Sequence, residues 1–149
     1  MIKLNLPSFE CDLKNENGKV MIFDSIRKKY IVLTPEEWVR QHFLNYLIQY
    51  AKYPKTLIKV ESGLTFNTLQ KRSDIVVFDR TGSPWLLVEC KSPQEKIDTN
   101  VLQQVSTYNA SLTAPHIAVT NGLVHFVFRI DRDQHATTQL SDFPEYPRE

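Results

Sequence analysis

Cysteine and long hydrophobic runs are both scarce in this sequence. The 149-residue chain has two cysteines, Cys11 and Cys90, too few for the disulfide framework of a secreted scaffold. No apolar stretch reaches the roughly 20 residues that a membrane-spanning helix needs. The first residues include no long hydrophobic signal region. We therefore expect a cytoplasmic protein that does not enter a membrane, long enough for one domain with its own core.

A strong excess of either charge is also absent. The chain has 18 Lys and Arg residues against 17 Asp and Glu, a formal net charge of +1. This balance argues against a protein that coats nucleic acid non-specifically. Residues 1–74 contain 12 basic and 8 acidic side chains (+4), whereas residues 75–149 contain 6 and 9 (−3). The basic first half either faces phosphates or is ordinary solvated surface.

Several well-known catalytic motifs are missing as well. The sequence has no Gly-rich phosphate loop, no Gly-x-Ser-x-Gly turn, and no paired Cys or His at zinc-binding spacing. It has no internal repeat and no low-complexity segment. We expect a single domain over residues 1–149, divided into an N-terminal β extension (1–33), a core (34–130) and a loosely held polar tail (131–149).

Two local signals stand out in the first third of the chain. Asn17-Gly18 lies between two strand-like runs and predicts a short β-hairpin. Thr34 is the expected N-cap of a helix, with Pro35 at the first helical position and Glu37 completing a capping box. The helical spacing of the apolar residues that follow predicts an amphipathic helix to about Tyr50.

The rest of the chain alternates between strand and helix signals. One further helix is expected at residues 99–112. Strands are expected at residues 30–33, 56–61, 73–79, 85–91, 117–119 and 123–130. A turn rich in Gly and Pro joins the third of these strands to the fourth as a hairpin. This order predicts an α/β (α+β) fold, with a mixed sheet flanked by helices and an N-terminal β-hairpin.

Three charged residues converge at one end of that predicted hairpin. Because strand side chains alternate, Glu89 and Lys91 point to one side and Cys90 to the other. Asp74 begins the preceding strand, which in an antiparallel pair lies beside the end of the next. Ionised groups on such apolar strands are costly unless they are paired or bound. The pattern predicts a functional site, and the alternative is a surface ion pair between Glu89 and Lys91 with Asp74 as a strand-end cap.

The chemistry that suits this trio is phosphodiester hydrolysis. Two carboxylates, Asp74 and Glu89, make a hard-oxygen site for Mg²⁺, with Mn²⁺ as a substitute. Such a metal would polarise a phosphoryl oxygen and lower the pKa of a bound water. Lys91 would orient that water or stabilise the charge that grows on the phosphorane oxygens. We therefore expect a metal-dependent phosphodiesterase.

Four short motifs occur in order along the chain. Residues 72–79 and 88–93 match a PD…(D/E)xK pattern, residues 104–109 match Q-x-x-x-Y, and residues 120–122 read Thr-Asn-Gly. On these motifs the chain resembles the PD-(D/E)XK nuclease superfamily, and within it the N-terminal nuclease domain of type I restriction enzyme R subunits. The resemblance covers residues 34–130, most of the chain.

The resemblance implies a restriction-endonuclease-like fold and a role for each matched residue. Asp74 and Glu89 would bind the metal, and Lys91 would assist the attacking water. Gln104 and Tyr108, one helical turn apart, would support the site or the DNA. Gln104 as an ordinary surface residue and Tyr108 as a core residue are the alternatives.

Family members often place a glutamate of the first helix near the metal, and two candidates compete for that place. Glu37 is accounted for by the capping box, so Glu36 is the favoured supporting residue, with a surface acid at the helix N-terminus as the alternative. Glu61 ends the first strand of the core and either helps the site or lies on an exposed edge. Lys71 and Arg72 are candidate substrate contacts to phosphate, or else solvated loop charges.

Two departures from the family pattern are visible. Ser73 stands where the family has proline, and the chain has no room for the translocase that type I R subunits carry. The expected function is Mg²⁺-dependent endonucleolytic cleavage of DNA, with RNA as substrate left open. The alternative is a nucleic-acid-binding or assembly module of a restriction or repair complex with little activity of its own. The expected partner is a second copy or a separate motor or specificity subunit.

Overall fold

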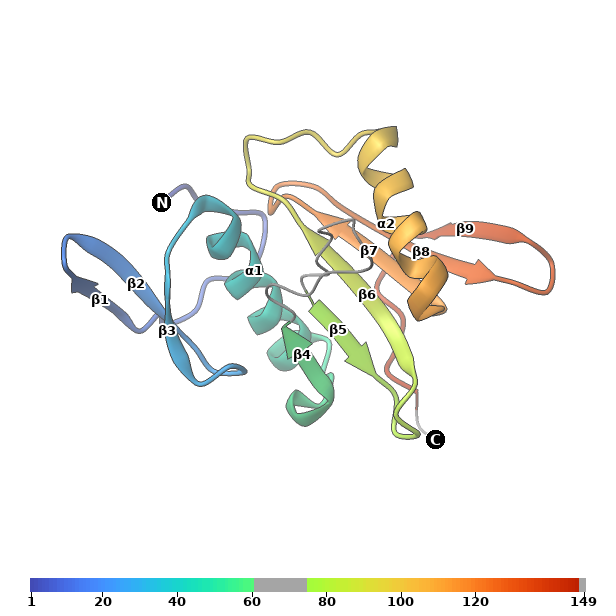
Figure 1. The fold of residues 1–149 in the computed structure, drawn as a ribbon, viewed down its shortest axis with the longest axis horizontal. Helices are drawn as coiled ribbons and strands as arrows, with labels where there is room; N and C mark the ends of the chain where they lie inside the picture. The colour runs from blue at the N-terminus through green and yellow to red at the C-terminus, as the bar shows by residue number, and fades with distance from the viewer. Residues whose placement is uncertain (61–74, 148–149) are drawn as a thin grey trace.

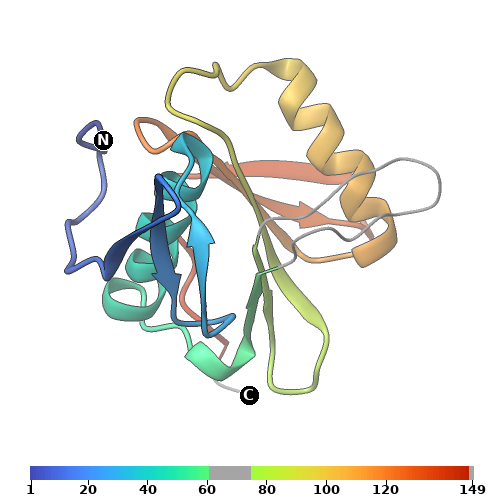
Figure 2. The same cartoon turned by 60° about the vertical axis from the view of Figure 1, so that its left-hand side comes forward.

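Two β-sheets and two α-helices form layers in the computed structural model of the chain, which describes residues 1–60 and 75–147. Helix α1 (Pro35–Asn45) lies between a three-stranded sheet and one face of a six-stranded sheet. Helix α2 (Thr99–Leu112) covers the opposite face of the six-stranded sheet, as Figure 1 and Figure 2 show. The predicted mixed sheet, flanking helices and N-terminal hairpin are confirmed.

The three-stranded sheet grows from the predicted hairpin. Strand β1 (Leu13–Glu16) pairs with β2 (Lys19–Asp24), which pairs in turn with β3 (Lys29–Val32), and both pairings are antiparallel. At the first turn Asn17 has φ 53° and Gly18 has φ 80°. Two successive positive φ angles are the conformation that Asn-Gly favours and that fits the twist of a two-residue hairpin.

Helix α1 begins as its sequence predicts, but its capping box is half formed. The Thr34 hydroxyl accepts a hydrogen bond from the Glu37 amide at 3.0 Å, and Pro35 occupies the first turn. The Glu37 carboxylate does not complete the box, because it accepts hydrogen bonds from Arg27, Arg40 and Gln41 instead. After Asn45 the helix widens into a π-helical turn, Tyr46–Tyr50, so the helical segment ends where it was expected.

The six-stranded sheet has the order β4-β5-β6-β7-β8-β9. Its strands are β4 (Ile58–Val60), β5 (Ile75–Phe78), β6 (Pro84–Cys90), β7 (His116–Thr120), β8 (His125–Asp131) and β9 (Ala136–Leu140). All neighbours are antiparallel except β6 and β7, which are parallel and are connected through α2. A parallel pair needs such a long crossover, so α2 is placed across the sheet beside β6 and β7.

A hydrophobic cluster fills each face of this sheet. The cluster on the α1 face includes Phe43 and Leu47 of the helical segment and Val88 of β6, all fully buried. The cluster on the α2 face is smaller and centres on Val105 of α2 and Leu87 of β6. Among the described residues, neither helix has the length and apolar character to cross a membrane.

The loosely held tail predicted after Asp131 is wrong for the part of it that the structure describes. Strand β9 pairs with β8 along its whole length. Beyond it, Phe143 packs on the ring of Phe43 with centroids 5.4 Å apart, and the Tyr146 hydroxyl donates a hydrogen bond to the Phe78 carbonyl at 2.7 Å. The contacts of Phe143 and Tyr146 join residues far apart in the chain, so no local pattern in the sequence indicates them.

Candidate functional site

The carboxyl end of β6 brings Glu89 and Lys91 together. The Lys91 Nζ atom lies 3.3 Å from Glu89 Oε2. The side chains of Lys91 and Glu89 are 20% and 19% exposed, so this ion pair is largely enclosed and is not a freely solvated surface pair. Val88 and Cys90 alternate with them and are fully buried on the α1 face. The strand alternation expected from the sequence therefore holds.

Charges around Lys91 keep its amine protonated. Burial acts to lower the pKa of Lys91, but the charge and hydrogen bond of Glu89, followed by the charges of Glu95 and Glu36, outweigh burial and raise the pKa above its usual value. Three carboxylates thus act on one ammonium group. At neutral pH Lys91 is a cation, suited to stabilising negative charge and unsuited to accepting a proton.

Strand β7 and the turn that follows it hold the segment after β6. The Lys91 amide donates to the Thr120 carbonyl at 2.8 Å, which extends the parallel pairing one step past the strand. The buried Asn121 side chain donates to the Glu95 carbonyl at 2.8 Å and accepts from the amides of Leu123 and Val124. Asn121 therefore ties the loop that carries Glu95 to the β7–β8 turn.

Gly122 completes this turn for a steric reason. Its φ angle is +86°, and a Cβ atom at this position would lie 2.8 Å from Cδ2 of Leu4, a buried residue of the N-terminal segment. Any other residue would be strained in its backbone and would push Leu4 out of place. The Thr-Asn-Gly motif thus has a structural role, which is to position the loop beside Lys91.

The two glutamates at the start of α1 have different surroundings. The Glu36 side chain is 44% exposed, is held by Arg40 Nη2 at 3.0 Å, and adds its charge to the environment of Lys91. The Glu37 side chain is 6% exposed and is bound by Arg27 and Arg40. Of the two, Glu36 is the one whose charge acts on Lys91 at the β6 end. The Glu37 carboxylate is occupied by an ion-pair network and not by a capping box.

That buried network was not predicted from the sequence. Asp24 is fully buried and accepts hydrogen bonds from the Arg27 side chain and from Gln41, each at 2.8 Å. These contacts hold the pKa of Asp24 below its usual value, although burial alone would raise it. Arg27 also donates to the Glu37 carboxylate at 3.0 Å, and so joins the β2–β3 turn to α1.

Glu95 was not predicted from the sequence either, because a lone acid in a loop carries no recognisable pattern.

The remaining predicted residues are only partly visible. Residues Glu61, Lys71, Arg72 and Asp74 lie outside the described residues. Strand β5 begins at Ile75, which pairs with Val88, the residue before Glu89. On α2, the Gln104 side chain is exposed, while the side chain of Tyr108 lies outside what the structure describes.

A divalent metal fits the chemistry of this end of β6 in part. Glu89 supplies carboxylate oxygens of the kind that Mg²⁺ binds, with Glu36 and Glu95 adding negative charge nearby. Within residues 1–60 and 75–147, no three His, Cys, Asp or Glu side chains converge as metal ligands. Asp74, the other carboxylate predicted from the sequence to bind the metal, lies outside this part of the chain.

Comparison with known proteins assigns a family. The family described as type I restriction enzyme R protein N terminus matches residues 35–144 of the sequence. The chain belongs to this family. No curated protein matches the sequence significantly.

A solved structure also resembles the chain. It is a fragment described as an HsdR subunit of a type I restriction enzyme from Vibrio vulnificus YJ016, 24% identical, with a TM-score of 0.42. The match covers 60% of the present chain and 19% of that one, so the chain spans about a fifth of that relative's length.

Proposed function

We propose that this chain is a Mg²⁺-dependent nuclease domain of the PD-(D/E)XK type that cleaves DNA. One observation carries the proposal, which is the enclosed Glu89–Lys91 pair at the carboxyl end of β6, inside the region that matches the R-protein family. A carboxylate and a cation at such a position favour a site that handles phosphate. The proposal extends the family assignment to a specific chemistry and to specific residues.

Asp74 and Glu89 would hold the metal in this proposal. Asp74 directly precedes Ile75 in the sequence, and Ile75 pairs with Val88, the residue before Glu89. When bound, Mg²⁺ would supply Lewis-acid polarisation of the phosphoryl oxygen and a more acidic water. Lys91, kept protonated by its carboxylate neighbours, would stabilise the charge that develops on the phosphorane oxygens.

The supporting residues act through position and charge. Arg40 holds Glu36 at 3.0 Å, and so sets the negative charge that acts on Lys91 from the start of α1. Gln104 and Tyr108 of α2, with Lys71 and Arg72, would contact the substrate or the site. DNA is the proposed substrate, and a second copy or a motor or specificity subunit is the proposed partner. Adding RNA as a competitor to the plasmid cleavage assay distinguishes the two substrates.

Plasmid cleavage tests the proposal. The chain should nick supercoiled DNA with Mg²⁺ or Mn²⁺, whereas Ca²⁺ should bind without supporting turnover, since it is larger and less strictly octahedral. Lys91→Ala should lower the rate by about two to four orders of magnitude. Lys96→Ala, an exposed lysine of the same loop, is the matched control and should cleave like the parent.

Two results would contradict the proposal. No cleavage by the parent with any divalent metal would favour an assembly module that keeps the fold without the activity. In the second, Lys91→Ala loses its folded circular dichroism spectrum while the fraction that stays folded cleaves normally. That result would show that Glu89 and Lys91 form a structural ion pair.

Binding of the chain to duplex DNA should be weak and strongly salt-dependent, because phosphate contacts release counterions.

A further inference from the structure

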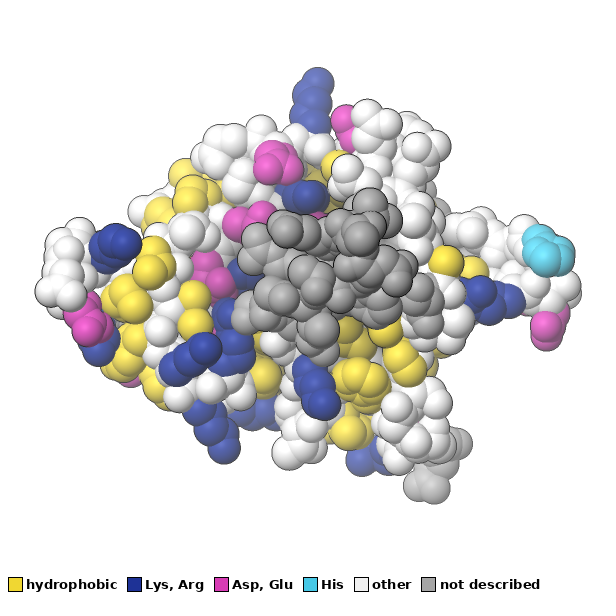
Figure 3. Space-filling view, viewed as in Figure 1, with side chains coloured by type: hydrophobic (Ala, Val, Ile, Leu, Met, Phe, Trp, Pro, Cys, Tyr) yellow, Lys and Arg dark blue, Asp and Glu magenta, His cyan; other side chains and the backbone are white. Residues whose placement is uncertain are grey.

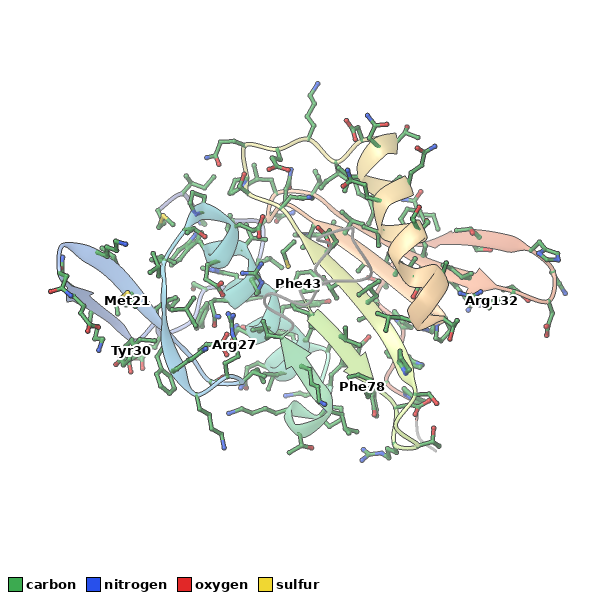
Figure 4. The ribbon with its side chains drawn as sticks, viewed as in Figure 1. Met21, Arg27, Tyr30, Phe43, Phe78 and Arg132 are labelled. Atoms are coloured by element: carbon green, nitrogen blue, oxygen red, sulfur yellow. The ribbon has the colours of Figure 1, made fainter. Side chains whose placement is uncertain are left out.

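The three-stranded sheet presents an apolar outer face. Ile22 and Asp24 of β2 point toward α1 and are fully buried, so Met21 and Phe23, which alternate with them, point away. The register places Val32 opposite Met21 and Tyr30 opposite Phe23. Phe23 is 36% exposed and Val32 is 40% exposed. Figure 3 shows hydrophobic side chains gathered over β1 to β3, and Figure 4 labels Met21 and Tyr30 on neighbouring strands.

The two rings on this face are held in place. Phe23 and Tyr30 meet edge to face, with centroids 5.2 Å apart. The Tyr30 hydroxyl donates to Asp12 at 2.8 Å, and Lys14 Nζ lies 4.2 Å from the centre of the Tyr30 ring. Phe23 is therefore an exposed aromatic side chain that is supported from the side, and its orientation costs little to maintain when a ligand arrives.

Lysines lie at both ends of this apolar outer face. Lys19 is at the β1–β2 turn, and Lys28 and Lys29 are at the β2–β3 turn, all exposed. No ion pair joins these three lysines to an acid within the described residues. Protein–protein interfaces are depleted in lysine, whereas an aromatic surface between cations is typical of surfaces that bind single-stranded nucleic acid.

We propose that the outer face of β1, β2 and β3 is a docking surface for single-stranded DNA, on which a base stacks against Phe23 while the flanking lysines contact phosphates. Charge complementarity selects this occupant over an apolar protein surface. The outer face also leads toward the site, since Val32 lies two residues before the N-cap of α1 and four before Glu36. The role of this surface in cleavage rests on the proposed nuclease function. Binding of single-stranded DNA to it can be measured whether or not the chain cleaves DNA.

Fluorescence anisotropy with a labelled oligo-dT, in EDTA so that cleavage plays no part, tests this surface. Phe23→Ala should weaken binding about tenfold, since stacking of one base on an aromatic ring has that scale of effect. Phe23→Trp should restore it. Tyr50→Ala removes an aromatic residue that is 58% exposed elsewhere on the chain and should leave the affinity unchanged.

Salt titration examines the lysines. A Lys28→Gln, Lys29→Gln double variant should reduce the slope of log K against log salt by about 1.4, or about 0.7 for each phosphate contact. The binding assay contains no metal and does not depend on cleavage. The parent can therefore bind oligo-dT even if it fails to cleave DNA in the plasmid assay. Conversely, cleavage can persist while this surface binds nothing. The two failures are therefore distinguishable.

Three outcomes would overturn the inference. Phe23→Ala could bind oligo-dT as tightly as the parent, or the parent could prefer duplex DNA to the single strand. The third outcome is a doubled mass for the parent in light scattering and a single mass for Phe23→Ala. That result would assign this face to a second copy of the chain.

Discussion

The two faces of the six-stranded sheet are built differently. The α1 face buries a cluster of 15 residues, and the C-terminal segment reaches it through hydrogen bonds that span 68 and 91 residues of sequence. The α2 face buries a cluster of 6 residues, supplied by α2, by the strands under it and by the turn that follows the helix. Stability should therefore be concentrated on the α1 face. Glu89 is two residues after Leu87 on β6 and so points to the same, α2 side of the sheet. It lies at the end of the sheet where charges from both layers act on Lys91.

Truncating one core residue on each face should reveal the difference in stability between the two faces most clearly. Phe43→Ala on the α1 face should cost about 3–5 kcal/mol, because a fully buried aromatic ring leaves a large cavity. Val105→Ala on the α2 face should cost about 2 kcal/mol, since it removes two methyl groups. Urea unfolding followed by circular dichroism measures both. Equal losses would show that the two faces contribute alike.

Breaking the buried ion-pair network should have the next largest effect. Asp24→Ala leaves Arg27 without its fully buried partner and should cost about 3 kcal/mol in the free energy of unfolding. Glu16→Ala removes the exposed partner of Lys14 and should change stability by less than about 0.5 kcal/mol. A loss below about 1 kcal/mol for Asp24→Ala would mean that the network does not join the N-terminal sheet to α1.

The contrast between the faces also explains what the sequence could predict. The sequence predicted helix α2 at its observed bounds, because the spacing of its apolar residues is a local signal. The Asn17-Gly18 hairpin was equally visible for the same reason. The tail was wrongly expected to be loose, because Tyr146 is held by Phe78, 68 residues earlier.

The candidate site was predictable to a similar extent. Strand alternation was enough to pair Glu89 with Lys91, and a hairpin turn was enough to bring β5 alongside β6. The partner of Glu37 was not predictable, since Arg27 comes from a separate sheet and no local pattern joins it to α1. The position of Glu95 was not predictable either, since Asn121, from the turn after another strand, helps to hold its loop.

Acid should weaken the α1 face first. Burial lowers the pKa values of His42 in α1 and of His116, whose ring lies against Trp85 of the α1-face cluster. As the pH falls below about 6.5, the unfolded state binds protons that the folded state does not, so stability falls. Between pH 7 and pH 6 the loss should be below about 1.5 kcal/mol. Unfolding at several pH values measures the slope, which His42→Gln should flatten. A stability that rises on acidification would contradict these assignments.

The smallest effect should come from the tail. Tyr146→Phe removes the hydroxyl that donates to the Phe78 carbonyl at 2.7 Å and should cost about 1 kcal/mol. The ring remains to pack against Tyr53 and Trp85, so the fold should survive. Hydrogen exchange of the Ala136–Leu140 amides reports whether β9 loosens with it. An unchanged free energy of unfolding would show that packing alone holds the tail.

Calorimetric titration with Mn²⁺ tests the central claim, that the carboxyl end of β6 is a metal-dependent nuclease site, most directly. The parent should bind one ion, and Asp74→Asn and Glu89→Gln should each lose that binding while they remain folded. Lys91→Ala should bind as well as the parent or better, because a neighbouring cation repels the metal. Asp133→Asn, at an exposed acid of the β8–β9 turn, is the control and should bind normally. If the Asp74 and Glu89 variants both bind Mn²⁺ like the parent, the assignment of this site is wrong.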